Sequence, residues 1–270
     1  MIPGISPAME TLLARCLQEP VTDLSAEQLN ERPITLFAAT DPEAKLLGIE
    51  FNGGPELTIA VTDPTKRLGA VRVQTGGSNS LLFFDNADTR STSWGGNLHA
   101  SIRMLGADCL GFFNAIGAEY VALQDVLMRS STQLLYWGIG ASAVGLSIEL
   151  EGEGNGALIG DDALVSNGVW IRNYDMHSMH DLRSGTQINK PSADTVIERH
   201  VWLGQDALLL GCRRIGRGSI VGAKALVKGM VPARVAVGGI PARVLRDEVS
   251  WGRHPYELSD AERLAIRPPG

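Results

Sequence analysis

The stretch IERHVWLGQDALLLGCRRIGRGSIVGAKALVK, residues 197–228, carries an aliphatic side chain at every sixth position. A period of six matches neither the 3.6-residue turn of an α-helix nor the two-residue alternation of a half-buried strand. It matches a triangular β-solenoid, in which each hexapeptide forms one short face and three hexapeptides close one coil. The repeated residues are Ile197, Leu203, Leu209, Ile215, Val221 and Val227, and the same step occurs earlier at Ile159, Val165 and Ile171. The pattern predicts an all-β solenoid with these side chains in its interior.

The repeat continues upstream in a looser form. Four short units that run from polar to apolar residues align at Phe83, Phe112, Tyr136 and Ile159, with steps of 29, 24 and 23 residues. Each step is long enough for one coil and an irregular bulge. Stacked coils bury a continuous core that no single repeat could bury. We therefore expect a parallel β-helix over residues 56–240.

Both ends of the chain are expected to form caps, because the open ends of a solenoid must be covered. A helical pattern near the N-terminus includes a capping box from Ser25 to Gln28, and a second capping box begins at Ser259. These features predict a helical or irregular N-terminal cap over residues 1–55 and a C-terminal cap with a short helix over residues 241–270.

The six-residue register breaks between Ile171 and Ile197. The two residues are 26 positions apart where six would continue the coil, which predicts an excursion loop at about residues 172–195. Long ordered loops on rigid scaffolds tend to carry functional residues. Two of the five histidines, His177 and His180, fall inside this loop.

The composition is that of a globular protein, with 44% hydrophobic and 20% charged residues among 270. It argues against a disordered or membrane-spanning chain. The first 20 residues lack the basic start and apolar core of a secretory signal. The cysteines, Cys16, Cys109 and Cys212, follow no metal-ligand spacing and are typical of free thiols in a reducing compartment. We therefore expect a cytoplasmic protein without a membrane span.

Charge is distributed unevenly along the chain. Residues 199–253 contain ten Lys and Arg but only three Asp and Glu, a net charge of +7, so the remainder must carry −13 to give the total of −6. A cationic segment in an acidic protein favours one polyanionic ligand at a defined place. Nucleic acid would require a larger basic excess over the whole domain, so a phosphorylated small molecule is the better candidate.

Several segments resemble, in order, the hexapeptide-repeat acetyltransferases, nearest to the capsular polysaccharide and sialic acid O-acetyltransferases. They are IRNYDMHSMHD at 171–181, IN at 188–189, IERHVWLG at 197–204, IVGA at 220–223 and GGIPARV at 238–244. The good match covers about residues 155–253. The resemblance implies a left-handed parallel β-helix, acetyl-CoA as co-substrate, a carbohydrate acceptor and a homotrimer.

The resemblance also implies roles for individual residues. His177 stands where the family has its catalytic base, and Trp202 stands where it has an aromatic residue near the acetyl group. The expected coenzyme-binding residues are Gly204, Gly222, Ala223, Lys228 and Arg243, with the last two near the phosphates. His180 and Asn189 are expected to bind the acceptor. The sequence departs from the family at His180, where a non-ionisable residue is usual, and at Gln187, where a basic residue is common.

The chemistry of these residue types agrees with acetyl transfer. A histidine can remove the proton of the attacking hydroxyl at cellular pH. Either Asp175 or Asp181 could orient the imidazole, and backbone amides or the Trp202 indole could stabilise the oxyanion. Direct transfer needs no covalent intermediate, since holding donor and acceptor together supplies much of the rate.

Other readings of the same residues stay open. A zinc-dependent lyase could use His177, His180 and His200, but their spacing does not return at coil intervals, so no metal is expected. A non-catalytic carbohydrate-binding solenoid would leave the histidine-bearing loop unexplained. An amino-sugar N-acetyltransferase differs from an O-acetyltransferase only in the acceptor, which the sequence does not identify.

Overall fold

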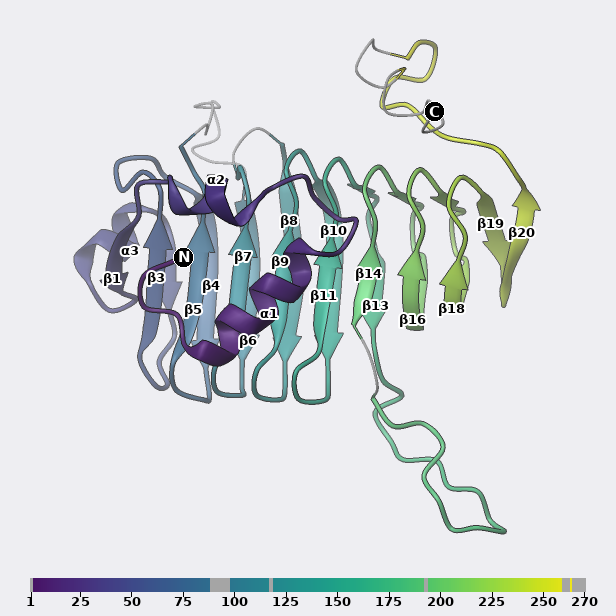
Figure 1. Ribbon diagram of the computed structural model, residues 1–270, viewed down its shortest axis with the longest axis horizontal. Coiled ribbons are helices and arrows are strands. Elements are labelled where there is room, and N and C mark those ends of the chain that lie inside the picture. The colour runs from purple at the N-terminus through teal and green to yellow at the C-terminus, as the bar shows by residue number, and fades with distance from the viewer. Residues whose placement is uncertain (1, 88–97, 117–118, 192–193, 259–262, 264–270) are drawn as a thin grey trace.

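In the computed structural model, which describes residues 2–87, 98–116, 119–191, 194–258 and 263, the chain winds into a stack of triangular coils (Figure 1). Strands of successive coils pair in parallel and form one continuous sheet. The expected parallel β-helix is confirmed. Among the described residues, no helix is long and apolar enough to cross a bilayer.

Each coil has three faces, numbered here in chain order. The first face consists of β3 (Leu57–Val61), β5 (Ser80–Phe84), β7 (Leu110–Phe113), β9 (Leu134–Trp137), β11 (Gly156–Ile159), β14 (Thr195–Ile197) and the ends of β16 (Leu208–Ile215) and β18 (Leu226–Val231).

The second and third faces share one long, bent strand per coil in the N-terminal half. These strands are β4 (Gly69–Thr75), β6 (Leu98–Met104), β8 (Val121–Met128) and β10 (Ser142–Leu150). In the C-terminal half the two faces are formed by separate strands, because β10 pairs with both β12 and β13. The second face is then β12 (Leu164–Val165), β15 (Trp202–Leu203), β17 (Ile220–Val221) and β19 (Ala236–Gly239), and the third is β13 (Val169–Arg172) with the starts of β16 and β18.

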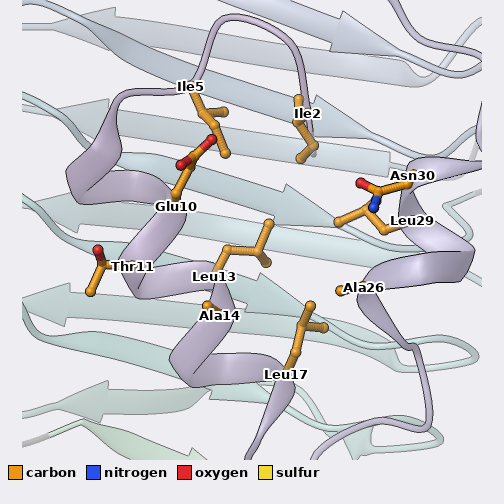
Figure 2. A pocket seen from close by; sticks show the side chains of 10 residues that line it. All are labelled: Ile2, Ile5, Glu10, Thr11, Leu13, Ala14, Leu17, Ala26, Leu29 and Asn30. Carbon is orange, nitrogen blue, oxygen red and sulfur yellow. The ribbon is translucent and has the colours of Figure 1, made fainter.

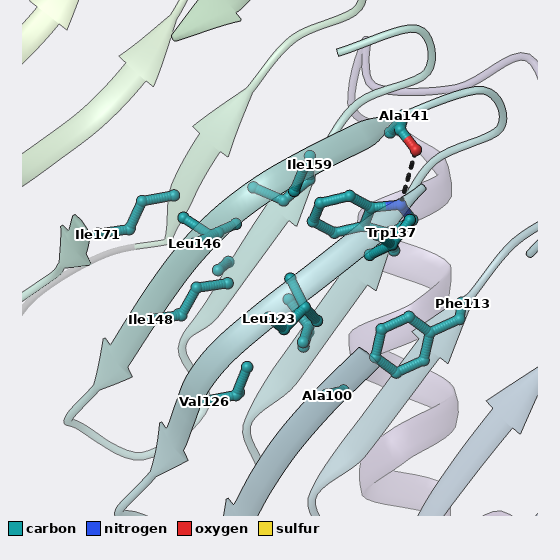
Figure 3. Packing of buried hydrophobic residues seen from close by; sticks show 14 of the residues in the cluster. Ala100, Phe113, Leu123, Val126, Trp137, Ala141, Leu146, Ile148, Ile159 and Ile171 are labelled. Atoms are coloured by element: carbon teal, nitrogen blue, oxygen red, sulfur yellow. Dashed lines mark hydrogen bonds between the residues drawn. The ribbon is translucent and has the colours of Figure 1, made fainter. Parts of the chain in front are cut away.

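The interior of the prism holds the residues of the six-residue repeat. All nine predicted aliphatic side chains are at most 1% exposed and belong to one hydrophobic core. Upstream the same core contains larger side chains such as Phe113 and Trp137 (Figure 3). The Trp137 indole N–H donates to the Ala141 carbonyl oxygen at 3.2 Å, so its one polar atom is satisfied. Burying an aliphatic or Phe side chain in this way contributes about 1.5–3 kcal/mol.

The first face differs from the other two because it is buried on both sides. Every residue of β5, β7, β9 and β11 is buried, whereas β4 alternates between buried and exposed positions. The outward side chains of the first face include Phe83, Phe112 and Tyr136, whose rings stack with centroids 4.6 and 5.4 Å apart. A strand that is apolar on both sides requires a covering layer.

Helix α1 (Pro7–Leu17) is that covering layer. It lies across the outside of the first face and buries Met9, Leu12, Leu13 and Cys16 against it (Figure 1). Between α1 and α2 (Ala26–Asn30) remains a mostly apolar cavity of about 310 Å³ (Figure 2). The expected capping box from Ser25 to Gln28 begins α2 and is confirmed. The N-terminal helix therefore covers a flank of the prism rather than its open end.

One sequence alignment is wrong by a residue. Phe83, Phe112 and Tyr136 are in register as expected, but Tyr136 pairs with Leu158, and Ile159 pairs with Trp137. Leu158 and Ile159 are adjacent aliphatic side chains of equal size, so the sequence does not distinguish which of them faces outward. A slip of one residue exchanges the two sides of a strand, so Ile159 belongs to the interior.

The two ends of the stack are closed by short elements. At the N-terminal end, β1 (Thr35–Ala38) pairs antiparallel with β3, α3 (Pro42–Leu46) buries Ala44, and β2 (Ile49–Phe51) begins the parallel pairing with β4. At the other end β20 (Ala242–Arg246) folds back antiparallel on β19. The helix expected from Ser259 lies outside the described residues.

Candidate functional site

Three edges separate the faces of the prism and provide the frame for the site. The first edge, between the first and second faces, includes residues 160–163, 198–201 and 216–219, and the second edge, between the second and third faces, includes residues 166–168, 204–207 and 222–225. The expected excursion loop is present and leaves the third edge after Arg172, extending away from the stack until β14 begins at Thr195 (Figure 1).

His177 lies near the base of this loop and is exposed. Its backbone N–H donates to the Asp175 carbonyl oxygen at 2.7 Å, directly after Met176, whose φ of 61° turns the chain. The imidazole has no hydrogen-bond partner among the described residues, and the Asp175 carboxylate accepts from the Asn189 amide instead. Both ring nitrogens are therefore available to a bound molecule.

Asn189 joins the two legs of the loop. Its amide group donates to the His177 carbonyl oxygen at 2.8 Å and to the Asp175 carboxylate at 3.3 Å, and its carbonyl oxygen accepts from the Met179 N–H at 2.7 Å. Its carbonyl oxygen also accepts from the Gln187 side-chain amide at 3.4 Å, so all four of its hydrogen-bonding positions are used within the loop. The structure gives Asn189 the role of holding His177 in place, and its contact with an acceptor stays a prediction.

Asp181 and His180 lie farther along the loop, and their side chains form hydrogen bonds with other residues of the loop. The Asp181 carboxylate accepts from the N–H groups of Arg183 and Ser184 at 2.9 and 2.8 Å and from the Ser184 hydroxyl at 3.0 Å. These bonds, those of Ser184 above all, hold the pKa of Asp181 below its usual range. His180 Nδ1 lies 3.2 Å from the Gly185 carbonyl oxygen. The structure does not bring Asp181 to the His177 imidazole.

A cavity of about 430 Å³ opens beside His177 at the base of the loop, and Tyr174 and Glu151 help to line it. The Tyr174 hydroxyl donates to Glu149 Oε2 at 3.3 Å, and burial raises the pKa of Tyr174. The phenol therefore stays protonated at neutral pH. Sequence reasoning missed these side chains, although Tyr174 stands only three residues before the histidine.

Trp202 lies on the second face, which is opposite to the third edge where the loop begins. Its side chain points outward, is 37% exposed, and donates its indole N–H to the Ser166 hydroxyl at 3.3 Å. Within one chain the fold therefore places Trp202 and His177 on different sides of the prism.

The predicted coenzyme residues Gly204, Gly222 and Ala223 lie on the second edge. The N–H groups of both glycines are used between coils, since they donate to Val221 and Val237 at 2.8 Å. Ala223 is exposed, and its N–H has no acceptor among the described residues. Of the predicted coenzyme residues on this edge, Ala223 is thus the one whose backbone N–H is available to a ligand.

Lys228 on β18 and Arg243 on β20 are both exposed, and neither forms an ion pair with a described residue. Other cations of the +7 segment are neutralised by residues outside it. Arg199 pairs with Asp23, Arg214 with Glu19 and Glu198, and Arg253 with Asp162. Three of the ten cations of this segment therefore stabilise the fold, and Lys228 and Arg243 remain available to a ligand.

His200 is buried on the first edge, at 3% exposure, beneath a segment that returns from the C-terminus. Its Nδ1 lies 2.6 Å from the Asp162 carboxylate, its Nε2 lies 3.0 Å from the Trp251 carbonyl oxygen, and its ring stacks on that of Trp251 at 4.4 Å. Both ring nitrogens therefore face hydrogen-bonding oxygens of the protein. Arg253 adds hydrogen bonds to Asp162 at 3.0 and 2.8 Å. This arrangement occupies both nitrogens of His200, which removes it from the possible zinc site.

Asp162→Asn is expected to lower the free energy of unfolding at pH 7 by about 1–2 kcal/mol, since charge-assisted hydrogen bonds are lost and the carboxylate is 40% exposed. Burial alone would raise the pKa of Asp162, but its bonds with His200 and Arg253 outweigh burial and lower it. The stabilisation is therefore present above the usual Asp pKa of about 3.9 and is lost as the pH falls through the lower folded-state value. Urea unfolding from pH 5 to 3 should show the two proteins converging; a constant difference would contradict this assignment.

Part of the chain is similar in sequence to a known O-acetyltransferase, and most of it is similar in fold to two solved ones. A polysialic acid O-acetyltransferase of Neisseria meningitidis is 34% identical over 99 residues, which are 36% of this chain and 46% of that protein. The structure of the polysialic acid O-acetyltransferase OatWY matches with a TM-score of 0.59 and 23% identity over 79% of this chain and 94% of that one. The polySia-specific acetyltransferase NeuO matches with a TM-score of 0.55 and 18% identity over 78% and 91%. Over about a third of its length the chain is thus similar in sequence to a polysialic acid O-acetyltransferase.

This chain shares the left-handed parallel β-helix with OatWY and NeuO, so the expected fold class is confirmed. The chain spans about half the length of the curated relatives it matches. No protein-family model matches it. No group of three or more metal-ligating side chains is found in the described part of the chain.

Proposed function

We propose that the chain is an acetyl-CoA-dependent O-acetyltransferase that acts on a sugar hydroxyl of a surface polysaccharide or its precursor. The observation that carries the proposal is the sequence similarity to O-acetyltransferases. It is supported by the His177 imidazole, which has no hydrogen-bond partner among the described residues. Use of acetyl-CoA, a product of central metabolism, agrees with a cytoplasmic location.

The proposed reaction is a direct transfer. His177 takes the proton of the sugar hydroxyl while its oxygen attacks the thioester carbonyl carbon. The carbon–sulfur bond then breaks, and the coenzyme thiolate receives the proton from the imidazolium. The Ala223 N–H is available to the coenzyme arm. The Trp202 indole N–H, which donates to the Ser166 hydroxyl in the free chain, exchanges this partner for the oxyanion. Asn189 and Asp175 hold the backbone of His177 in place.

The site requires a second copy of the chain. His177 leaves the prism at the third edge, whereas Trp202 and Ala223 lie on the second face and second edge. A loop that reaches the second edge of a neighbour makes a head-to-tail interface, which closes into a ring when the rotation permits. A homotrimer with one site between each pair of copies satisfies this geometry.

The exterior of the third face supports such an assembly. One outward column runs through Asp125, Ser147, Trp170, Leu208 and Leu226 in register. It is polar in the N-terminal coils and becomes apolar from Trp170, which is 38% exposed. The loop adds Leu182 at 98% exposure. Apolar groups gathered on one surface mark protein interfaces.

The function is tested by coenzyme release from acetyl-CoA in the presence of a panel of sugars. The panel contains polysialic acid, neutral oligosaccharides and amino sugars, and the products are examined for ester or amide linkages. Esters support the proposal, and amides would show an N-acetyltransferase instead. If nothing is acetylated, and calorimetry shows no coenzyme binding, a non-catalytic solenoid replaces it.

Lys228→Ala and Arg243→Ala are each expected to weaken coenzyme A binding about 10-fold and dephospho-coenzyme A binding less than about 3-fold, because each loses a charge-assisted contact to phosphate. Isothermal titration calorimetry measures both ligands. Lys45→Ala is the matched control, because Lys45 is an exposed lysine on α3 at the N-terminal end of the stack, far from the second edge of the C-terminal coils. Equal weakening of the two ligands would refute a contact to the 3′-phosphate.

A further inference from the structure

The outside of the N-terminal coils contains a hollow that the proposed reaction does not use. Two adjoining cavities of about 340 and 590 Å³ share Ala70 and Arg72 in their lining. Small outward side chains lie at the two sides of this hollow, since Ala70 of β4 and Ala122 of β8 are in register with His99 of β6 between them. Together they form one open groove across β2, β4, β6 and β8.

The charge of this groove is opposite to that of its surroundings. Residues 1–150 contain nine Lys and Arg but sixteen Asp and Glu. Among the described residues, the groove lining includes three of these cations, Lys45, Arg67 and Arg72, against one carboxylate, Glu50. Glu50 pairs with Arg72 on the surface, while Lys45 and Arg67 form no ion pair with a described residue. The groove therefore favours an anion.

The other lining residues suit a carbohydrate. His99 and Ser101 on β6 and Gln124 on β8 supply exposed or half-buried hydrogen-bonding groups on two adjacent coils. Next to them the His99 ring lies 5.6 Å from that of Tyr120, which is 48% exposed. An exposed aromatic ring offers an apolar surface and a polar tip to a sugar ring.

The groove lies on the same edge as the proposed transfer site. The long strands shift register between Ala100 and Ile102 and between Ala143 and Leu146, which is where each turns the second edge. Gly145 at this bend packs against Asn167 of the next coil. Residues 204–207 form the same turn one coil farther along the stack. From β4 to β15 there are five coil steps, or about 24 Å at the usual strand spacing.

We infer that this groove binds a segment of an acidic, carboxylate-bearing polysaccharide and leads its acceptor sugar along the second edge toward Trp202. The inference rests on the proposed function, because it takes the bound polysaccharide to be the acceptor of the acetyl group. Binding to the groove is measured without acetyl-CoA, so it is tested separately from the transfer reaction. In the proposed homotrimer, the apolar contacts between copies involve the C-terminal coils only. The groove, which lies on the N-terminal coils, therefore stays accessible.

The test is calorimetric titration of the full-length protein with polysialic acid and with neutral dextran of equal length. Arg67→Ala/Arg72→Ala is expected to weaken polysialic acid binding at least ~10-fold, since two charge-assisted contacts are lost. Glu50→Gln is expected to tighten it. The matched control is Arg103→Ala, because Arg103 lies on β6 but is held by Asp125 and does not line the groove.

The two proposals fail in different ways. The groove proposal is wrong if the parent protein does not bind polysialic acid, if the double variant binds it equally well, or if dextran binds as strongly. Polysialic acid binding that depends on Arg67 and Arg72, in a protein that acetylates no sugar, would support the groove and overturn the proposed transferase. Thermal melting of each variant separates loss of contacts from loss of folding.

Discussion

His177→Ala is expected to lower turnover at least ~100-fold while coenzyme A binding stays unchanged, as for the loss of a general base. The imidazole makes no structural hydrogen bond among the described residues, so its removal should leave the loop intact. Steady-state kinetics with acetyl-CoA and an acetylated sugar measure turnover, and calorimetry measures coenzyme binding.

The matched control is His180→Ala, which removes an exposed histidine from the same loop, three residues on, where it bonds Gly185. It is expected to keep turnover within a few-fold of the parent. If His177→Ala is nearly as active as the parent, or if His180→Ala loses as much, the base is not His177.

Mixing inactive variants tests whether the site is shared between copies. If His177 of one copy acts beside Trp202 of the next, His177→Ala and Trp202→Ala subunits refolded together should recover about a quarter of the parent activity, as random head-to-tail pairing dictates. Each variant alone should remain inactive. Activity that does not recover on mixing would place both side chains in one chain, against the geometry of the faces.

Gly204→Ala is expected to destabilise the fold by about 1–3 kcal/mol, the usual cost of overpacking. A Cβ at this position would stand 2.6 Å from the Val221 carbonyl oxygen and 2.7 Å from the Ala223 nitrogen. Both are backbone atoms of the next coil, so the coils would have to separate. Thermal or urea unfolding without ligand measures the effect.

Gly222→Ala is the matched control, because its Cβ would meet the Val237 carbonyl oxygen at 3.2 Å, a contact that a small shift relieves. We expect a clearly smaller loss of stability. Equal losses would show that coil stacking does not explain the demand for glycine at residue 204, and would leave coenzyme binding as its reason.

The location of the candidate loop was predictable, but its internal contacts were not. The interruption of the six-residue step marks its two ends, and His177 stands out as an ionisable residue inside it. Asp181 stands only four residues after His177 in the sequence, which made it a reasonable partner for the imidazole. The chain turns at Asp181, however, and its carboxylate accepts from the backbone N–H groups of Arg183 and Ser184. Asn189, ten to fourteen residues from its partners, is what holds the base of the loop.

The amino-acid sequence alone determined the coil, because each inward side chain packs on residues one coil away and the same demand recurs every six positions. Only the tertiary structure decided where α1 lies, that His200 is buried under Trp251, and that the loop and Trp202 occupy opposite sides of the prism. These features depend on contacts between segments far apart in the chain, which no repeat constrains. A periodic pattern records local stacking and carries no information about which flank an additional segment covers.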